Sequence, residues 1–460
     1  MKTEPAYPSK SIAWYTVGVM FLLYWLSILD RLIISLLVEP IKADLQITDF
    51  QFSMLLGLSF ALFYALFGLP FGWMVDKFNR RRIIFLGVAI WSIATAACGL
   101  AAGYWQLFAA RIGVGAGEAA LGPGASSILS DTFPRERLTF AMTVFGLGAT
   151  VGGGVAYALG GWFIGATSEL DSVMLPLIGA VRPWQLVFLG LGLPGIAVGA
   201  LLFTFPEPVR RGRLSQSFSG DGSKRDHGAD FRRLIDFIKT NRRFFVAHFC
   251  GFPIVAALSS GVGVWIPAYM GRVFGWESSQ IGTALGVVYG GGGIVGMLFG
   301  GKCVDWMFRR GFKDAHMRFM FYCALAAGVA GLVGFSSTDP WFFVVCILVF
   351  HLCLCSLPSV ASAALQVVTP NEFRGQITAL YTAVGGLFAI SVGPAVIASF
   401  TDFVFKDEAL LGNSMMLFIT IACPMAVFFL WTGLKAMDTA VGVAEERDRL
   451  AGQGQAAEAS

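Results

Sequence analysis

Four charged side chains lie inside apolar segments of this chain, where charge is unfavourable. Asp30 and Arg31 interrupt the apolar run 17–37. Arg111 and Glu118 lie seven positions apart in a later apolar segment, which puts them on one helical face and about 10 Å from each other along the axis. A charge at the centre of a bilayer costs about 2.5–3.5 kcal/mol on insertion scales, and such residues usually face a bundle interior or a watery cavity. The four residues therefore indicate a polar chamber inside a membrane bundle.

This set of two carboxylates and two guanidinium groups predicts a proton relay. Burial disfavours the charged form of a carboxyl group and a nearby guanidinium favours it, so an arginine that moves between partners can load and unload a proton. Asp30 and Glu118 would carry the proton and Arg111 or Arg31 would be the moving partner, because arginine does not titrate near neutral pH. Arg31 also presents a planar fork that suits a phosphate or carboxylate head group. A static ion network that orients two helices is the alternative interpretation.

The elements that hold these residues are expected to cross a membrane. Hydrophobic residues make up 56% of the chain and charged residues only 13%, whereas soluble domains carry about 25% charged residues. Each crossing needs about 20 apolar residues, and the apolar segments here are too long and too uniform for barrel strands. We therefore expect an all-α membrane protein with twelve transmembrane helices at residues 14–38, 51–75, 82–102, 105–131, 137–166, 184–205, 243–274, 279–307, 317–336, 340–369, 375–401 and 412–436.

The basic residues predict the orientation of these helices. Lysines and arginines crowd the loops on one side, and the loops on the other side hold only Lys42, Arg182, Arg272 and Lys406. Basic loops stay in the cytoplasm. The sequence thus predicts a multi-pass protein of a bacterial-style inner membrane, with no cleaved signal peptide and with both termini in the cytoplasm.

The two halves of the sequence echo each other across a polar linker. The pattern Gly-x-x-x-Asp-x-x-x-Arg-Arg occupies positions 72–81 and returns at 301–310. Internal repeats of this kind are typical of transporters built from two six-helix halves. The expected organisation is a cytoplasmic tail at 1–13, a six-helix bundle at 14–205, a linker with an amphipathic helix at 206–242, a second bundle at 243–436 and a disordered tail at 437–460.

On these motifs the chain resembles the major facilitator superfamily over nearly its whole length. The loop 72–81 is similar to the signature Gly-x-x-x-Asp-(Arg/Lys)-x-x-(Arg/Lys)-(Arg/Lys), and residues 111–118 resemble the fourth-span signature of that superfamily. Within it, the segments 24–31, 111–119 and 133–137 resemble the Spinster group, which moves lysolipids and sphingoid lipids. The resemblance implies the major facilitator fold, with two pseudo-symmetric six-helix bundles that rock around a central cavity.

The resemblance also implies a conformational latch in the two repeated loops. The aspartate of such a loop can sit at the positive N-terminal end of a helix in the other half, and the contact breaks when the halves rock. The predicted latch residues are Gly72, Asp76, Arg80, Arg81, Asp305, Arg309 and Arg310.

The second half carries few intramembrane charges and many aromatic residues, which favours an amphiphilic cargo with a charged head and a long tail. A sugar would need more amide and hydroxyl groups converging from both halves. The predicted substrate-binding residues are Arg31, Arg111, Glu118, Tyr64, Trp265, Tyr269, Tyr289, His351 and Tyr381.

Several functions are disfavoured by what the sequence lacks. It has no phosphate-binding loop of the Gly-x-x-x-x-Gly-Lys-Ser/Thr type, which argues against ATP-driven transport. It has no recognisable catalytic set, its four histidines are scattered, and its eight cysteines form no CxxC pair. We expect no enzyme activity, cofactor, metal or nucleic-acid partner, and a protein that works as a monomer. Two alternatives stay open: a proton-coupled transporter of a small organic anion or drug, and a membrane receptor that binds its ligand without transporting it.

Overall fold

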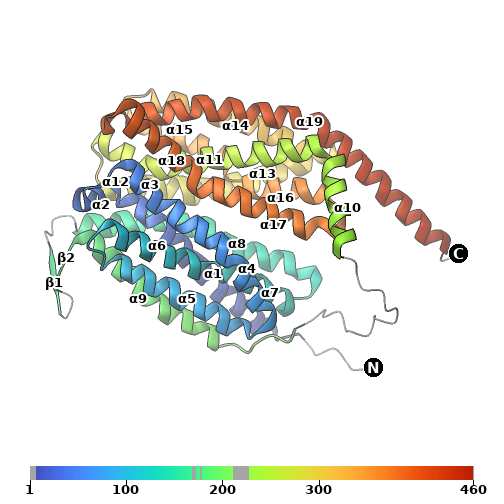
Figure 1. Cartoon of the computed structure of the whole chain (residues 1–460), viewed down its shortest axis with the longest axis horizontal. Coiled ribbons are helices and arrows are strands. Elements are labelled where there is room, and N and C mark those ends of the chain that lie inside the picture. Colours follow the sequence, from blue (N-terminus) through green and yellow to red (C-terminus); the bar gives the residue numbers. More distant parts are fainter. Residues whose placement is uncertain (1–6, 168–171, 177–178, 211–226, 459–460) are drawn as a thin grey trace. The chain divides into compact units, whose positions relative to one another are not determined.

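A computed structural model of the chain describes residues 7–167, 172–176, 179–210 and 227–458 (Figure 1). The helices up to residue 210 are α1 (Lys10–Ile33), η1 (Ile34–Leu36), α2 (Val38–Leu45), α3 (Asp49–Leu56), α4 (Leu58–Lys77), α5 (Arg80–Cys98), α6 (Tyr104–Glu118), α7 (Leu121–Thr132), α8 (Arg135–Thr167), α9 (Pro183–Ala200) and η2 (Leu201–Phe203). Those after residue 226 are α10 (His227–Thr240), α11 (Arg242–Phe274), α12 (Ser278–Gly286), η4 (Val287–Gly292), α13 (Gly293–Arg309), α14 (Ala315–Phe335), α15 (Pro340–Leu354), α16 (Leu357–Val368), α17 (Asn371–Leu387), η5 (Phe388–Val392), α18 (Gly393–Ser399), η6 (Phe400–Phe405), η7 (Glu408–Leu410) and α19 (Leu411–Glu458).

The prediction of an all-helical membrane protein is confirmed. Within the described residues, eleven continuous helical stretches are long and apolar enough to cross a membrane. The remaining predicted crossing is the segment 104–132, where α6 and α7 follow each other across Ala119 and Ala120. Neither of these two helices reaches the length of a crossing by itself, but together they account for the predicted fourth span.

Local sequence explains where several helices begin. The Ser9 hydroxyl accepts a hydrogen bond from the amide of Ile12 at 3.4 Å and starts α1. Thr48 and Gln51 form a reciprocal capping box at the start of α3. Asp339 accepts hydrogen bonds from the amides of the second and third residues of α15, whose first residue is a proline. These side chains satisfy amide groups that the first turn of a helix leaves unpaired.

Two features differ from the sequence expectations. A short antiparallel hairpin, β1 (Val173–Leu175) and β2 (Gly179–Val181), lies between α8 and α9 in a loop for which no strand was expected. Helix α19 continues to Glu458 through the tail where disorder was expected. The tail is rich in Ala, Glu, Gln and Gly, and the high helix propensity of its Ala, Glu and Gln residues outweighs the glycines and the polarity. The linker residues 211–226 lie outside the described residues.

The described chain forms two compact units. Unit 1 comprises residues 1–215, 263–291 and 394–411, and unit 2 comprises residues 216–262, 292–393 and 412–460. Unit 1 therefore contains three segments from distant parts of the sequence, including the end of α11, helix α12 and the turns η6 and η7.

Inside unit 1, α1 packs along α8, and α5 packs against α6 and α9 (Figure 1). A glycine seam joins α8 to α12 and η4. A Cβ atom added to Gly154 would lie 2.5 Å from the Cα of Gly290, and one added to Gly161 would overlap the carbonyl of Ser278 and crowd Gly282. The small residues thus let the two backbones touch, as small-residue stripes do in membrane helices.

Inside unit 2, α14 packs against α15 and α11 packs against α19. His248 is fully buried, and its Nε2 lies 2.9 Å from the carbonyl oxygen of Ala361. It lies among aromatic rings, including that of Phe252 at 4.6 Å between centroids.

Candidate functional site

The centre of the site is an ion pair between α1 and α6. The Nε of Arg31 donates a hydrogen bond to Oε2 of Glu118 at 2.5 Å. Ser27, one turn before Arg31 on α1, donates its hydroxyl to the same carboxylate oxygen at 2.6 Å. The Glu118 side chain is completely shielded from solvent, whereas that of Arg31 is 23% exposed. The pair therefore has one buried end and one end that a ligand can reach.

Asp30 points to a different neighbour from Arg31. Consecutive helical residues diverge by about 100° around the axis, and Asp30 faces α5, where Thr95 donates its hydroxyl to Oδ2 of Asp30 at 2.5 Å. The other carboxylate oxygen of this buried residue has no hydrogen-bond partner among the described residues. Two consecutive residues of α1 thus direct a carboxylate toward α5 and a guanidinium toward α6.

Arg111 is buried beside Asp30 and Arg31. Its Cζ is 5.5 Å from the centroid of the Phe60 ring, and the Cζ of Arg31 is 4.7 Å from the same ring. The Nε and Nη1 of Arg111 have no hydrogen-bond partner in the described part of the chain, and no ion pair joins Arg111 to Asp30 there. The ion pair that forms in this cluster is Arg31 with Glu118, not Arg111 with Asp30. Helix rotation, which a count along the sequence does not give, decides this choice.

These side chains form a buried cluster of two acids and two bases, all in unit 1. Nearly every buried polar atom in a folded protein finds a partner. Here one oxygen of each carboxylate and two nitrogens of Arg111 do not, within the described residues. The cluster has the capacity to accept a proton, to exchange ion-pair partners and to bind an anionic group.

Three of the predicted aromatic cargo residues lie in unit 1. Tyr64 belongs to the charge cluster, because the Cζ of Arg31 lies 4.9 Å from its ring, which stacks on Phe60. Tyr289 packs on Tyr157 with ring centroids 4.9 Å apart. Trp265 is fully buried and donates its indole N–H to the carbonyl of Pro394 at 3.1 Å. These contacts all lie within unit 1.

The remaining predicted cargo residues are divided between the two units, with Tyr269 in unit 1 and the other two in unit 2. Tyr269 is buried near the end of α11, with its ring 5.5 Å from that of Phe274. Tyr381 of α17 packs edge-on against His248 in unit 2, with centroids 4.8 Å apart. His351 is half-buried on α15 of the same unit.

The loop 72–82 holds the first set of predicted latch residues. Arg80 is fully buried, and its guanidinium binds Glu207 at 2.8 Å, Asp131, and the carbonyl oxygens of Ser127 at 3.0 Å and Pro208 at 2.5 Å. All these partners belong to the first 208 residues. Arg80 therefore ties α5 to α7 and to the segment that follows α9.

The other predicted latch residues are more exposed. Arg81 binds Glu207 at 3.4 Å, and a Cβ atom on Gly72 would meet no atom of the described structure within 4 Å. Asp76 is exposed, and its backbone carbonyl accepts a hydrogen bond from Arg210. In unit 2, the corresponding exposed residues are Asp305, Arg309 and Arg310, the last of which covers the Trp306 ring at 4.4 Å.

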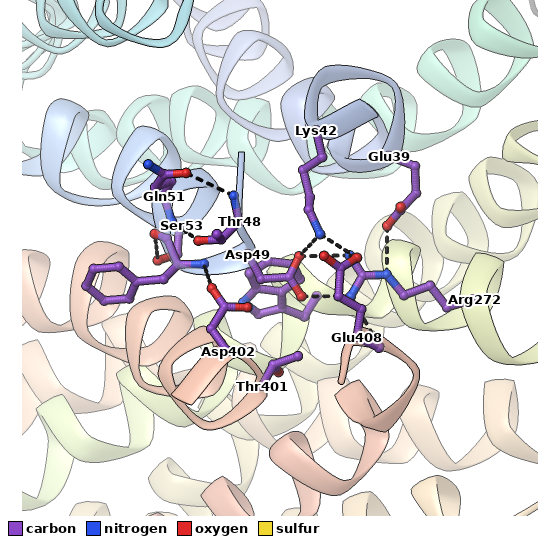
Figure 2. A network of polar contacts seen from close by, with 12 residues as sticks. Glu39, Lys42, Thr48, Asp49, Gln51, Ser53, Arg272, Thr401, Asp402 and Glu408 are labelled. Carbon is purple, nitrogen blue, oxygen red and sulfur yellow. Dashed lines mark hydrogen bonds and ion pairs between the residues drawn. The ribbon is translucent and has the colours of Figure 1, made fainter. Parts of the chain in front are cut away.

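A second ion network lies at the opposite end of the α3–α4 segment (Figure 2). Arg272 binds Asp49 with two parallel hydrogen bonds, Nη1 to Oδ2 at 2.7 Å and Nη2 to Oδ1 at 2.8 Å. Its Nε binds Glu39 at 2.8 Å. Lys42 binds Asp49 and lies 2.7 Å from a carboxylate oxygen of Glu408. Asp49 is completely buried, so its charge depends on this network.

A second contact fastens the same helix start. The amide of Phe50, in the first turn of α3, donates to the Asp402 carboxylate at 2.7 Å (Figure 2). A carboxylate at a helix N-terminus binds unpaired amides and complements the positive end of the helix dipole. Arg272 and Asp402 come from the second half of the sequence, and both bind residues at the beginning of α3.

Sequence reasoning missed the residues of this network and three residues around the charge cluster. Lys42 and Arg272 were counted only as loop charges, although the nearby acidic residues at 39, 49 and 408 offered a weak signal. Ser27, Thr95 and Phe60 carry no local signal, because their roles depend on which way their helices face. No group of three or more histidine, cysteine or acidic residues in the described chain could hold a metal ion.

Comparison with known proteins identifies relatives that match most of this chain. The family model of the Major Facilitator Superfamily matches residues 20–394. Protein spinster homolog 3 of Danio rerio is 24% identical over 468 residues, which cover 93% of this chain and 86% of that protein. A probable sulfoacetate transporter of Cupriavidus necator is 27% identical over 337 residues, which cover 69% of this chain and 70% of that protein.

A crystal structure shares the fold. It is a bacterial homologue of the human lysosomal transporter Spinster, in an inward-facing and unoccupied conformation. It superposes with a TM-score of 0.76 over 95% of this chain and 99% of that chain, at 22% sequence identity. The chain thus has a major facilitator fold.

Proposed function

Because this chain belongs to the Major Facilitator Superfamily, we propose that it is a proton-coupled secondary transporter that moves a lysolipid or sphingoid-type lipid by alternating access. The family and the fold are those of multi-pass membrane transporters of small molecules, not those of enzymes. The proton, the lipid cargo and the alternating access are the content of the proposal.

The observation that carries it is the buried cluster of Asp30, Arg31, Arg111 and Glu118. Arg31 neutralises Glu118, while Arg111 has two nitrogens without partners and Asp30 keeps an oxygen without one in the described residues. A buried ion pair is a weak stabiliser compared with apolar packing, so stability alone gives little reason to keep four charges here. A cluster that exchanges partners does give a reason.

The proposed cycle couples protonation of a carboxylate to the release of an arginine. Asp30 or Glu118 takes up a proton, which weakens the hold of that carboxylate on a guanidinium. The released arginine then binds the head group of the cargo with its planar fork. Loss of the proton on the other side of the membrane restores the ion pair and expels the head group. The carboxylate and the cargo head group thereby compete for the same arginine, so proton uptake favours cargo binding.

The lipid class rests on the resemblance to the Spinster group and on the wall beside the arginines. Phe60 and Tyr64 flank Arg31 at 4.7 and 4.9 Å, so the head-group site has an apolar side. Trp265, Tyr269, Tyr289, His351 and Tyr381 are proposed to line the rest of the path.

Alternating access is proposed to involve the network around Asp49 as an outer gate. Its partners Arg272, Asp402 and Glu408 come from the second half of the sequence, whereas Glu39 and Lys42 come from the first. Such a contact must break before this end opens. At the other end, Asp76 and the repeated loop are proposed to form the inner latch that the superfamily resemblance implies.

The proposed orientation follows the basic loops. It puts the 72–82 loop, the linker and both termini in the cytoplasm of a bacterial-style cell and puts Asp49 at the outer face of the inner membrane. The protein is proposed to work as a monomer.

A small organic anion is the second candidate cargo. The partnerless nitrogens of Arg111 favour it, since they could bind a carboxylate or sulfonate without any tail. The name of the relative from Cupriavidus necator assigns it such an anion. A drug is a further option, and a receptor that does not transport is an alternative of another class.

Uptake into proteoliposomes tests these proposals. Glu118→Gln and Asp30→Asn should abolish accumulation of a fluorescent lysolipid driven by a pH gradient, while exchange without a gradient continues. Asp438→Asn, an exposed carboxylate on α19, is the matched control. Normal gradient dependence in both cluster variants would remove the proton relay. The absence of any exchange by the wild type would favour a receptor that does not transport its ligand.

Competition separates the cargos. Unlabelled lysolipid should inhibit lysolipid uptake, and sulfoacetate should not. Stronger inhibition by sulfoacetate would establish the organic anion in its place.

A further inference from the structure

A basic cavity lies on the surface of unit 2. It has a volume of about 780 Å³ and is formed by the start of α11 and the middle of α19. Arg242 and Arg243 line it from α11, and Lys435 lines it from α19. All three side chains are exposed, and the described structure records neither an ion pair nor a hydrogen bond for them. Three positive charges therefore line this cavity without an ion-pair partner among the described residues.

The floor of the cavity is apolar and firmly built. A Cβ atom on Gly433 would lie 2.8 Å from the Cβ of Ala247, and one on Gly251 would lie 3.1 Å from the Leu430 side chain. These glycines bring α19 and α11 into close contact. The exposed rings of Phe428 and Trp431 form its apolar wall.

A second cavity continues the first along α19. It has a volume of about 420 Å³, shares Phe428 and Trp431 with the basic cavity, and is otherwise lined by apolar residues of α14 and α19, including Pro424 and Leu325. Pro424, Phe428, Trp431 and Lys435 recur every three or four residues, so they form one stripe along α19. The stripe is apolar for about three turns and ends in a positive charge.

This arrangement is the complement of a phospholipid with an anionic head. We infer that the two cavities form a binding site for an anionic phospholipid of the inner leaflet, with its phosphate among Arg242, Arg243 and Lys435 and an acyl chain along α19. Arginine forks and lysine charges bind phosphate, and basic pockets between helices at the cytoplasmic face suit anionic head groups. A tryptophan at the junction matches the position that this residue takes at membrane interfaces.

None of the residues that line the two cavities belongs to the charge cluster or to the proposed cargo path. In the orientation proposed above, α11 begins and the membrane-spanning part of α19 ends at the cytoplasmic side, so only the choice of leaflet rests on the proposed function. The lipid held here is a structural ligand of α11 and α19 and is not the cargo.

Native mass spectrometry of the purified full-length protein tests the site. The protein is offered equal amounts of phosphatidylglycerol and phosphatidylcholine with identical acyl chains. The wild type should retain phosphatidylglycerol preferentially, and Arg242→Gln/Arg243→Gln should lose about fivefold in that preference for each arginine removed. Lys435→Gln should lose about fivefold by itself.

The chain offers a matched control in Arg309→Gln/Arg310→Gln, which also removes two adjacent exposed arginines from unit 2. The control should keep the wild-type preference. An equal loss in the control, or equal retention of the two lipids by the wild type, would overturn the inference. Complete displacement of the lipid by inorganic phosphate would also overturn it, because the acyl chain would then contribute nothing. Unchanged melting temperatures in all variants establish that folding is intact.

Discussion

The two ends of the α3–α4 segment both concentrate charge, but their ion pairs connect different parts of the sequence. At the 72–82 end, Arg80 binds Asp131 and Glu207, which like Arg80 belong to the first 208 residues. At the other end, Asp49 binds Arg272, 223 positions further along the chain. The first network holds a bundle together within itself. The second network joins segments from both halves of the sequence.

This difference teaches that burial and ion pairing alone do not mark a moving contact. Arg80 and Asp49 are both completely buried and both have several charged partners. What separates them is the origin of those partners. In the proposed rocking cycle, a contact within one half would persist, whereas a contact between halves would open.

The largest effect is expected at Arg80. Arg80→Gln leaves Asp131 and Glu207 without their buried partner, and breaking a buried ion pair costs about 3–5 kcal/mol. The free energy of unfolding, measured by denaturant titration in detergent, should fall by that amount. Arg82→Gln, an exposed neighbour on the same helix, should change it little. Similar values for the two variants would show that the Arg80 network is not structural.

The next effect is expected at Asp49 and appears in conformation rather than in stability. Asp49→Asn and Arg272→Gln should expose the buried Ser53 side chain, one turn into α3, to the outer solution. Labelling of Ser53→Cys by a membrane-impermeant thiol reagent should accelerate about 5- to 150-fold, the usual range for coupled conformational equilibria. Peptide mass mapping reads the labelled site despite the native cysteines.

Arg182→Gln is the control for this labelling experiment. Arg182 pairs with Asp44 at the same end of the unit, but both residues precede the linker. It should leave the labelling rate unchanged. Equal rates in all three variants would refute the outer gate without touching the transport proposal, because labelling needs neither cargo nor a proton gradient.

An effect on stability smaller than that at Arg80 is expected at the glycine seam. A Cβ on Gly161 would overlap the Ser278 carbonyl, and overpacking typically costs 1–3 kcal/mol. Gly161→Ala should lower the melting temperature, whereas Gly153→Ala, whose Cβ would meet only Leu32 at 3.5 Å, should not. A stable Gly161→Ala protein would mean that the seam tolerates separation of its helices.

The smallest effect is expected at Arg182 itself. Its side chain is 54% exposed, and exposed ion pairs contribute at most about 1 kcal/mol. The unfolding free energy of Arg182→Gln should stay within that margin of the wild type, because Trp184 continues to bind Asp44 at 2.9 Å. A much larger loss would place this pair with Arg80 and blur the contrast between the two networks.

The helical fold was predictable because hydropathy and length suffice to locate a membrane helix. The all-helical architecture and the family follow from apolar segments and from short motifs such as Gly72–Arg81. The break after Glu118 was not predictable, because Ala119 and Ala120 are good helix formers. The helical tail beyond residue 437 was missed because polarity was weighted above helix propensity.

The candidate site was predictable in its residues but not in its pairing. Charges buried in apolar segments identified Asp30, Arg31, Arg111 and Glu118 without any structure. Helix rotation determines that Arg31 rather than Arg111 holds Glu118, and spacing along the sequence does not report rotation between helices. The partnership of Asp49 with Arg272 had even less signal, because it depends on tertiary contact between segments that share no motif.

The glycine seam has a mechanical consequence. Where side chains of two helices interlock, each side chain must leave its groove before the helices can slide past each other. Gly154 faces Gly290, and Gly161 faces Gly282, so backbone lies on backbone at both points. At these two points α8 meets α12 and η4 through backbone alone, so a small shift of the helices there requires no side chain to change its rotamer.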